Sequence, residues 1–514
     1  MVTSTAISQL DKSKRTILVG GLLLFFILLA MPTPDSLSDQ GWKVVAIAVL
    51  MLCWWVGEAV PIPVTAMLPI VLFPVLDVMP IAKVTTSYGH PIVFLFMGGF
   101  ILALAMERWR LHLRIALSII RLTGTSANGI IAGFMLATAF LSMWMSNTAT
   151  TVMMLPIALS VIQLLFGQND ASLKQATPQQ KRFALSLMLA VAFAANIGGT
   201  ATLTGTPPNA IFAGALSSQF GYDISFADWM LIGVPFASVL LALCWIILVH
   251  VVYPSRLGNI EGADEMLEKQ WQSLGKMSRQ EKFVLIIFSG TALLWIFKSA
   301  LVSLLNDMFA LQLNQKNFTD TGVAMFAALL LFILPLDRRC SQFILKWEDM
   351  KNFPWGILLL FGGGLSLAGA MGKSGLVDVV GGQIAPLAEH GVLILVFAIV
   401  LVVLMFTECM SNLALITIFL PVLFGIALDI GEDPLLLAIP ATLAASCAFM
   451  LPMATPPNAI VFASGHIRMP QMVRVGIVLN IIAVLLIVTF MPTLVAWVFG
   501  VEQGVVPSWA SAGD

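Results

Sequence analysis

Long apolar runs, separated by short polar loops, occupy most of this chain. The runs are roughly 18–25 residues long and do not alternate apolar with polar positions, which indicates helices and not strands. A helix of that length crosses a hydrocarbon core of about 30 Å, where only helices or a closed barrel satisfy the backbone hydrogen bonds. The pattern therefore predicts an all-α polytopic membrane protein.

Two of the apolar runs, 128–166 and 391–430, are too long for one crossing. As a single helix the first would be about 58 Å long at about 1.5 Å per residue, against a core of about 30 Å. Each run has a Ser-Asn pair near its middle, Ser146-Asn147 in one and Ser411-Asn412 in the other. We expect both runs to bend back at these pairs and to form re-entrant hairpins with the polar pair at the tip.

Charged residues indicate the direction of each crossing, because Lys and Arg concentrate in short cytoplasmic loops. The N-terminal segment carries Lys12, Lys14 and Arg15, and the segment 106–122 carries four arginines and is predicted to be an amphipathic helix on the inner surface. The alternation predicts eleven crossings, with a cytoplasmic N-terminus and an extracytoplasmic C-terminus. The crossings are expected near 17–31, 43–59, 62–79, 90–107, 183–220, 229–252, 283–304, 320–336, 354–371, 436–463 and 472–498.

Two parts of the chain repeat each other. Ser146-Asn147 and Pro156 recur 265 positions later as Ser411-Asn412 and Pro421, and the motif TPPNAI at 206–211 recurs 249 positions later at 455–460. Each repeat holds five crossings, and this odd number gives the two repeats opposite orientations, as in many secondary transporters. The predicted division is an N-terminal segment with the first span (1–41), a first repeat (42–252), a cytoplasmic linker (253–282), a second repeat (283–499) and an extracytoplasmic tail (500–514).

Composition and charge exclude several classes of function. Only 10% of the residues are charged, against about 25% in soluble proteins, and the net charge of −1 gives no reason to expect nucleic acid as a partner. The five cysteines include no CxxC pair, which argues against a zinc site. The chain lacks HExxH and GxSxG motifs, so little favours an intramembrane enzyme. A channel is a further alternative, although two symmetric re-entrant tips fit alternating access better.

The polar tips and the proline motifs are the candidate binding groups. Pro207 breaks a helix because it has no backbone N–H. A broken helix exposes an N-terminus, which attracts anions, and free carbonyls, which coordinate hard cations. Ser146 and Asn147 add neutral donors and oxygen ligands, and the combination suits an anionic substrate beside small alkali cations. The alternative is that these side chains only bond neighbouring helices, but their symmetric positions at two tips favour binding.

Glu408 lies three residues before Ser411, inside the second hairpin. A carboxylate within a membrane segment is a functional candidate by default. A structural pairing with the backbone or with a cationic partner is the alternative, and the sequence does not separate the two.

Four stretches together resemble one known family of transporters. They are GEAVPIPVTAMLPIVLFP, MSNTATTVMMLPIA, GTPPNAI and the second set of SN and TPPNAI motifs. From about Trp42 to Phe499 the chain resembles the divalent anion:sodium symporter family, also called the INDY or solute carrier 13 group. This resemblance implies eleven spans, two opposed hairpins, a homodimer, and an elevator mechanism in which a transport domain slides against a scaffold domain.

The resemblance also implies which residues bind. The implied substrate-binding residues are Ser146, Asn147, Thr148, Ser411, Asn412, Leu413, Thr206, Pro207, Thr455 and Pro456. Two sodium sites are implied, and no other cofactor. The ligands of the first are Ser142, Ser146, Asn147 and the carbonyl of Gly205, and those of the second are Thr407, Met410, Asn412 and the carbonyl of Ala454. Ser142 and Thr407 share the offset of 265, so the repeat supports this pairing.

The resemblance implies sodium-coupled symport of C4 dicarboxylates such as succinate, malate or fumarate, in a bacterial inner membrane. The expected partners are the dicarboxylate, Na⁺, membrane lipid and a second copy of the chain. A sodium-independent dicarboxylate exchanger of the same fold, or a transporter of sulfate or citrate, is the alternative. Leu413 departs from the family pattern, which often has Thr at this place. Since a neutral hydrogen bond contributes about 0.5–1.5 kcal/mol, this loss would tune selectivity and would not abolish binding.

Overall fold

The computed structural model describes residues 4–166, 176–309, 317–336, 342–373 and 391–511, and within them all regular secondary structure is helical. The first part forms α1 (Ser4–Ala30), α2 (Asp39–Gly57), α3 (Ile62–Thr65), α4 (Leu68–Val75), α5 (Ile81–Tyr88), α6 (Pro91–Arg108), α7 (Leu111–Leu122), α8 (Ala127–Ser142) and α9 (Asn147–Phe166). The middle forms α11 (Pro178–Gly199), α12 (Pro207–Phe220), α13 (Phe226–Ile246), the π-helix η1 (Ile247–Val252), α14 (Ala263–Ser273), α15 (Arg279–Phe309) and α16 (Asp320–Ile333). The last part forms the 3-10 helix η3 (Trp347–Asn352), α17 (Trp355–Lys373), α19 (Val392–Thr407), α20 (Asn412–Asp429), α21 (Leu435–Ala445), α22 (Pro456–Ala463), α23 (Met469–Phe499) and α24 (Ser508–Ser511).

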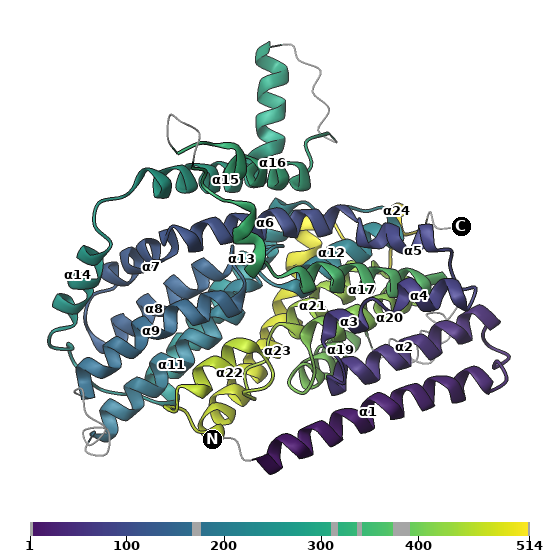
Figure 1. Ribbon diagram of the computed structural model, residues 1–514, viewed down its shortest axis with the longest axis horizontal. Coiled ribbons are helices and arrows are strands. Elements are labelled where there is room, and N and C mark those ends of the chain that lie inside the picture. The colour runs from purple at the N-terminus through teal and green to yellow at the C-terminus, as the bar shows by residue number, and fades with distance from the viewer. Residues whose placement is uncertain (1–3, 167–175, 310–316, 337–341, 374–390, 512–514) are drawn as a thin grey trace.

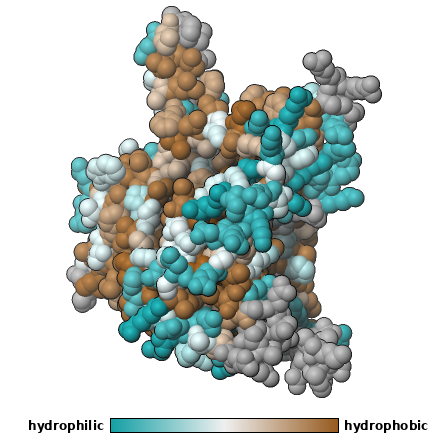
Figure 2. All heavy atoms as spheres, turned by 90° about the vertical axis from the view of Figure 1, so that its left-hand side faces the viewer, coloured by the Kyte–Doolittle hydropathy of each residue, from teal (hydrophilic) through white to brown (hydrophobic). Residues whose placement is uncertain are grey.

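The lengths of these helices confirm the prediction of an all-α polytopic membrane protein. Among the described residues, nine helical segments are long and apolar enough to cross a bilayer, and five shorter apolar helices accompany them. In Figure 1, α1 and α2 run side by side, and α7, α8, α9 and α11 lie together on the left. Figure 2 looks onto that left-hand side and shows hydrophilic side chains gathered across its middle, with broad hydrophobic areas around them.

The run 128–166 folds back at its Ser-Asn pair, as the sequence predicts. Its first arm, α8, ends at Ser142, and its second arm, α9, begins at Asn147. The free ends of both arms meet the same loop before α14: the Ala127 amide donates to the Gly258 carbonyl at 3.0 Å, and Leu164 packs against Gly262. The two arms therefore start and finish on one side of the molecule. The second run is interrupted likewise, because α19 ends at Thr407 and α20 begins at Asn412.

The expected crossing at 62–79 is not one continuous helix. The segment 62–79 forms two short helices, α3 and α4, which are separated at Ala66 and Met67. Pro69 lies at the second position of α4, where its missing N–H removes the bond that would continue α3. The Tyr88 hydroxyl donates to the carbonyl of Ala66, which lies in the break, at 2.6 Å, so α5 bonds to the backbone of the break.

Helix α11 is the centre of the part that carries the first hairpin. Every residue from Phe183 to Gly199 is buried. It packs against both arms of the hairpin, α8 and α9, and against α22 of the second repeat. Because α11 is held on all sides, its C-terminal end at Gly199 has a fixed position, and the proline motif that follows is presented at a defined place.

Candidate functional site

A cavity of about 710 Å³ lies where the two hairpin tips meet the two proline motifs. Residues from all four segments line it. From the tips these are Ser146, Asn147, Thr148, Cys409, Met410, Ser411, Asn412 and Leu413. From the proline motifs they are Thr204, Gly205, Thr206, Pro207, Pro208, Met453, Ala454, Thr455, Pro456, Pro457 and Ala459. The structure thus brings together every residue for which the sequence predicted contact with substrate.

Four helices begin at this cavity. Their first residues, Asn147 of α9, Pro207 of α12, Asn412 of α20 and Pro456 of α22, all line it. Each helix N-terminus carries a partial positive charge, so the four ends make the cavity attractive to anions. The first residues of α9 and α20 also have backbone N–H groups, whereas α12 and α22 each begin with two prolines, which have none. Among the lining residues, which all belong to the described part of the chain, only Lys14 and Glu58 carry a charge. An anion in the cavity would therefore be held mainly by backbone dipoles and neutral side chains.

Two asparagines hold the proline motifs in matching conformations. The Asn209 Nδ2 donates to the carbonyls of Gly199, Thr200 and Thr202 at 3.4, 3.3 and 2.8 Å. The Asn458 Nδ2 donates to the carbonyls of Ala448 and Leu451, both at 3.1 Å. Positions 199, 202 and 209 correspond to 448, 451 and 458 at the same offset of 249. The two repeats therefore share this hydrogen-bond pattern as well as the sequence motif. In each repeat the asparagine side chain bonds to carbonyls of the non-helical segment that precedes α12 or α22.

At the first tip, several oxygen atoms crowd together beneath the cavity. The hydroxyl of Ser142, which is fully buried, lies 2.6 Å from Asn147 Oδ1 and 2.8 Å from the Ala195 carbonyl. Asn147 Oδ1 also lies 3.1 Å from the Ala195 carbonyl and 3.3 Å from that of Gly205. The Ser142 hydroxyl has a single proton, which can form a hydrogen bond to only one of these oxygens, so the other oxygen–oxygen contacts have no proton between them. Either the Asn147 amide turns its nitrogen to the two carbonyls, or a cation lies among the oxygens, and oxygen atoms are the ligands that hard cations prefer.

The second tip repeats this arrangement. The hydroxyl of Thr407, also fully buried, lies 2.7 Å from Asn412 Oδ1 and 2.6 Å from the Ala445 carbonyl. Ala454 and Met410, the other two residues implied for this cation site, line the cavity above it. A hydroxyl with one proton again faces two acceptor oxygens. The donor sets at both tips therefore fit a small hard cation.

Some lining residues lay outside the sequence-based prediction. Asn196 of α11 is 2% exposed, and its Nδ2 donates to Thr455 Oγ1 at 3.0 Å and to Asn458 Oδ1 at 3.3 Å, so it ties the first repeat to the second at the cavity. Its only signal in the sequence is a lone amide in an apolar stretch. Lys14 and Glu58 line the cavity at the end that carries the N-terminal segment. Glu58 has φ 44° and forms the left-handed C-cap of α2.

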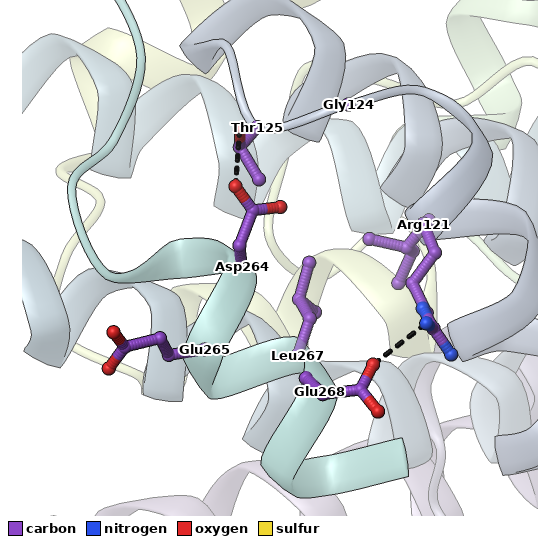
Figure 3. A pocket seen from close by; sticks show the side chains of 8 residues that line it. Arg121, Gly124, Thr125, Asp264, Glu265, Leu267 and Glu268 are labelled. Atoms are coloured by element: carbon purple, nitrogen blue, oxygen red, sulfur yellow. Dashed lines mark hydrogen bonds and ion pairs between the residues drawn. The ribbon is translucent and has the colours of Figure 1, made fainter.

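A smaller pocket of about 480 Å³ lies between the end of α7 and the start of α14. Figure 3 shows its acidic lining: Asp264 accepts from the Thr125 hydroxyl at 3.2 Å, and Glu268 pairs with Arg121 at 2.7 Å. Glu265 adds a third carboxylate against one guanidinium. This balance of charge disfavours an anionic ligand in this pocket.

The chemistry of the cavity favours binding over catalysis. The Ser146 hydroxyl accepts from the Ala149 amide at 3.2 Å, where it caps α9. No histidine is among the residues that line the cavity in the described part of the chain, so Ser146 has no base beside it of the kind a nucleophilic serine needs.

The comparisons with known proteins agree with this geometry. A family model described as the sodium:sulfate symporter transmembrane region matches residues 12–501. The sodium-dependent dicarboxylate transporter SdcS of Staphylococcus saprophyticus is 42% identical over 491 residues, which cover 94% of this chain and 92% of that protein. SdcS of Staphylococcus aureus strain USA300 is 41% identical over 486 residues, again with 94% and 92% covered.

Two solved structures share the fold at low sequence identity. The YdaH transporter of Alcanivorax borkumensis superposes with a TM-score of 0.53 at 12% identity, over 81% of this chain and 88% of that one. MtrF of Neisseria gonorrhoeae superposes with a TM-score of 0.55 at 14% identity, over 85% and 87%. At such identities the likeness is one of fold alone.

Proposed function

The chain belongs to the sodium:sulfate symporter family, also known as the divalent anion:sodium symporters, and from this premise we propose that it transports C4 dicarboxylates together with Na⁺. Succinate, malate and fumarate are the proposed substrates. The relatives named above are transporters of dicarboxylates that depend on sodium, and their names also disfavour the intramembrane enzyme. The family places the chain in a membrane, and its bacterial relatives favour the plasma membrane.

The observation that carries this proposal is the convergence of four helix N-termini on one cavity. A dicarboxylate has two negative ends, and the two repeats supply two N-termini each. Thr148 is exposed in the cavity, whereas its counterpart Leu413 is 8% exposed and offers no hydroxyl. The first tip therefore offers one more hydroxyl donor than the second, so the two carboxylates of the substrate would have different hydrogen-bond donors.

Na⁺ is proposed to bind beneath the two tips. Ser142, Ser146, Asn147 and the Gly205 carbonyl form the first proposed site, and Thr407, Met410, Asn412 and the Ala454 carbonyl form the second. The crowded oxygens at Ser142 and at Thr407 support this assignment. Because Asn147 and Asn412 also reach the cavity, one side chain at each tip would touch both the cation and the substrate, and this contact would couple their binding.

The proposal includes the membrane arrangement implied by the family: eleven crossings, two opposed re-entrant hairpins, a homodimer, and an elevator movement of a transport domain. It also includes a cytoplasmic N-terminus and an extracytoplasmic C-terminus. Lys14 and Glu58 at one end of the cavity support an opening toward the side of the N-terminus. With the N-terminus in the cytoplasm, the conformation described here would be the inward-facing one.

Uptake of labelled succinate into proteoliposomes tests the function. With Na⁺ outside and choline inside, we expect accumulation well above that with choline on both sides. Moving a negative charge inward against 100 mV costs about 2.3 kcal/mol, and the charge of each Na⁺ that moves with it cancels one such cost. Several Na⁺ would therefore offset the cost for the dianion, and each Na⁺ moved down a tenfold gradient supplies about 1.4 kcal/mol more. Uptake driven equally well by internal succinate in K⁺ alone would favour the exchanger, and preferential uptake of sulfate or citrate would overturn the assignment of substrate.

Cys409 offers a test of the site without any substitution in the binding residues. Its side chain is exposed and lines the cavity, whereas Cys244 and Cys447 are buried. We expect a membrane-impermeant methanethiosulfonate reagent to inactivate uptake, and we expect Na⁺ with succinate to slow that inactivation several-fold. The Cys409→Ser variant is the matched control and should transport while resisting the reagent. Equal rates of inactivation with and without succinate would place the substrate elsewhere.

A further inference from the structure

Glu408 is a buried carboxylate that the proposed transport sites do not use. It is 1% exposed and is not among the residues that line the cavity. It follows Thr407, whose hydroxyl belongs to the second proposed cation site. A carboxylate so far from water is costly unless it is well bonded, so its partners decide its role.

Every hydrogen-bond partner of this carboxylate is a donor. Oε1 accepts from the amides of Phe449 and Met450 at 2.8 and 2.9 Å and from Asn480 Nδ2 at 2.7 Å. Oε2 accepts from the amides of Met450 and Leu451 at 3.1 and 3.0 Å. A protonated carboxyl would turn one O–H against an N–H in this arrangement, so the donors suit the ionised form. In the described part of the chain, no Lys or Arg forms a salt bridge with Glu408, and the negative charge is held by dipoles alone.

The first repeat does without such a carboxylate. The position 265 residues earlier is Met143, which has no charge. The amides of Thr200 and Ala201, which correspond to Phe449 and Met450 at the offset of 249, donate to the carbonyls of Ile197 and Gly198 at 3.1 Å each. In the first repeat the end of α11 therefore satisfies these amides. In the second repeat α21 already ends at Ala445, before position 448, which corresponds to the end of α11 at Gly199, so the amides are left for Glu408.

We infer that Glu408 is a positioning residue for the second cation site and makes that site the stronger of the two. This inference rests on the proposed function. The carboxylate fixes the backbone at 449–451, which leads directly into the Ala454 carbonyl. It also places a full negative charge next to Thr407, in surroundings with little water to screen it. The first site has neutral ligands and Met143 in place of this charge, so the second site would take up Na⁺ first as the concentration rises.

The test is the stabilisation of the purified full-length protein by Na⁺ in the absence of dicarboxylate. Thermal melts are recorded against Na⁺ concentration, with choline keeping the ionic strength constant. We expect Glu408→Gln to raise the half-saturating Na⁺ concentration at least about tenfold, because an amide removes the charge and turns an NH₂ toward N–H groups. A purely structural role would lower the melting temperature in choline and leave the half-saturating concentration unchanged.

Glu432→Gln is the matched control. Glu432 is also a buried carboxylate of the second repeat and is 6% exposed. It accepts from the amide of Gly504 at 2.9 Å, and Gly504 lies far along the chain from both hairpin tips. We expect this variant to keep the wild-type dependence on Na⁺. If Glu408→Gln does not fold, Glu408→Asp serves instead: it keeps the charge but shortens the reach, and should weaken Na⁺ binding less than tenfold. A wild-type response to Na⁺ in the Glu408 variant that folds would overturn the inference while the transport function stands, whereas no response in the wild-type protein would overturn both.

Discussion

Replacing Asn147 by Ala is expected to reduce Na⁺-driven succinate uptake to the level of empty liposomes. Asn147 touches the Ser142 hydroxyl and the carbonyls of Ala195 and Gly205 below the tip, and it lines the cavity above it. A hydrogen bond to a charged group is worth about 1.5–3 kcal/mol, and tenfold in affinity corresponds to about 1.4 kcal/mol. Loss of the side chain at two ligands together should therefore lower uptake by about two orders of magnitude or more.

The second tip gives the matching experiment. Asn412→Ala removes the contact with the Thr407 hydroxyl at 2.7 Å and should have an effect of similar size. Asn128→Ala is the control for both tips. Asn128 lies near the start of α8, at the end of the first hairpin away from the tip, and its bond to Trp245 is made by its backbone carbonyl and not by its side chain. Uptake is measured as a function of Na⁺ and of succinate, with surface expression checked for each variant. Normal transport by both tip variants would show that the tips do not form the site.

The parts of the fold that could be read from the sequence are those fixed by local rules. The length of the apolar run 128–166 alone excludes a single straight transmembrane helix, and the Ser-Asn pair marks the bend. The proline motifs mark where helices start again, because proline lacks the N–H of an interior position. The offsets of 265 and 249 then relate the two repeats, and the structure reproduces the second offset in the bonds of Asn209 and Asn458.

Contacts that depend on how the two repeats dock were beyond the sequence. Asn196 donates to Thr455 and Asn458, which lie 259 and 262 positions later in the sequence. No residue near Asn196 in the sequence indicates these partners. The role of Glu408 stayed open for the same reason, since its partners at 449–451 belong to another helix pair. The break within 62–79 had a local signal in Pro69, but the segment is apolar throughout, and hydropathy alone predicts one crossing. The bond from Tyr88 to the Ala66 carbonyl appears only in three dimensions.

Replacing Gly199 by Ala is the second change expected to abolish transport, and it does so without replacing any proposed ligand. A Cβ at this last residue of α11 would lie 3.0 Å from Asn147 Nδ2 and 3.1 Å from Asn147 Cγ, with Oδ1 nearer still. The neighbour that must give way is a side-chain amide, so the helices can keep their places while the amide leaves its position. We expect a folded protein with uptake close to background, and a loss of stability of about 1–3 kcal/mol from overpacking.

Two other glycines separate this effect from a general intolerance of added methyl groups. A Cβ on Gly198 would lie 2.5 Å from Ala139 Cα and 2.7 Å from its carbonyl carbon, which are backbone atoms of α8 that cannot swing aside, so Gly198→Ala should lower folded yield. A Cβ on Gly290 would meet nothing within 4 Å, so Gly290→Ala in α15 should transport normally and gain about 0.5–1 kcal/mol in helix stability. Melting temperature, folded yield and Na⁺-driven uptake distinguish the three variants. If Gly199→Ala transported like the wild-type protein, the Asn147 amide would not be held against α11 during transport, and the first cation site could not have the ligands proposed for it.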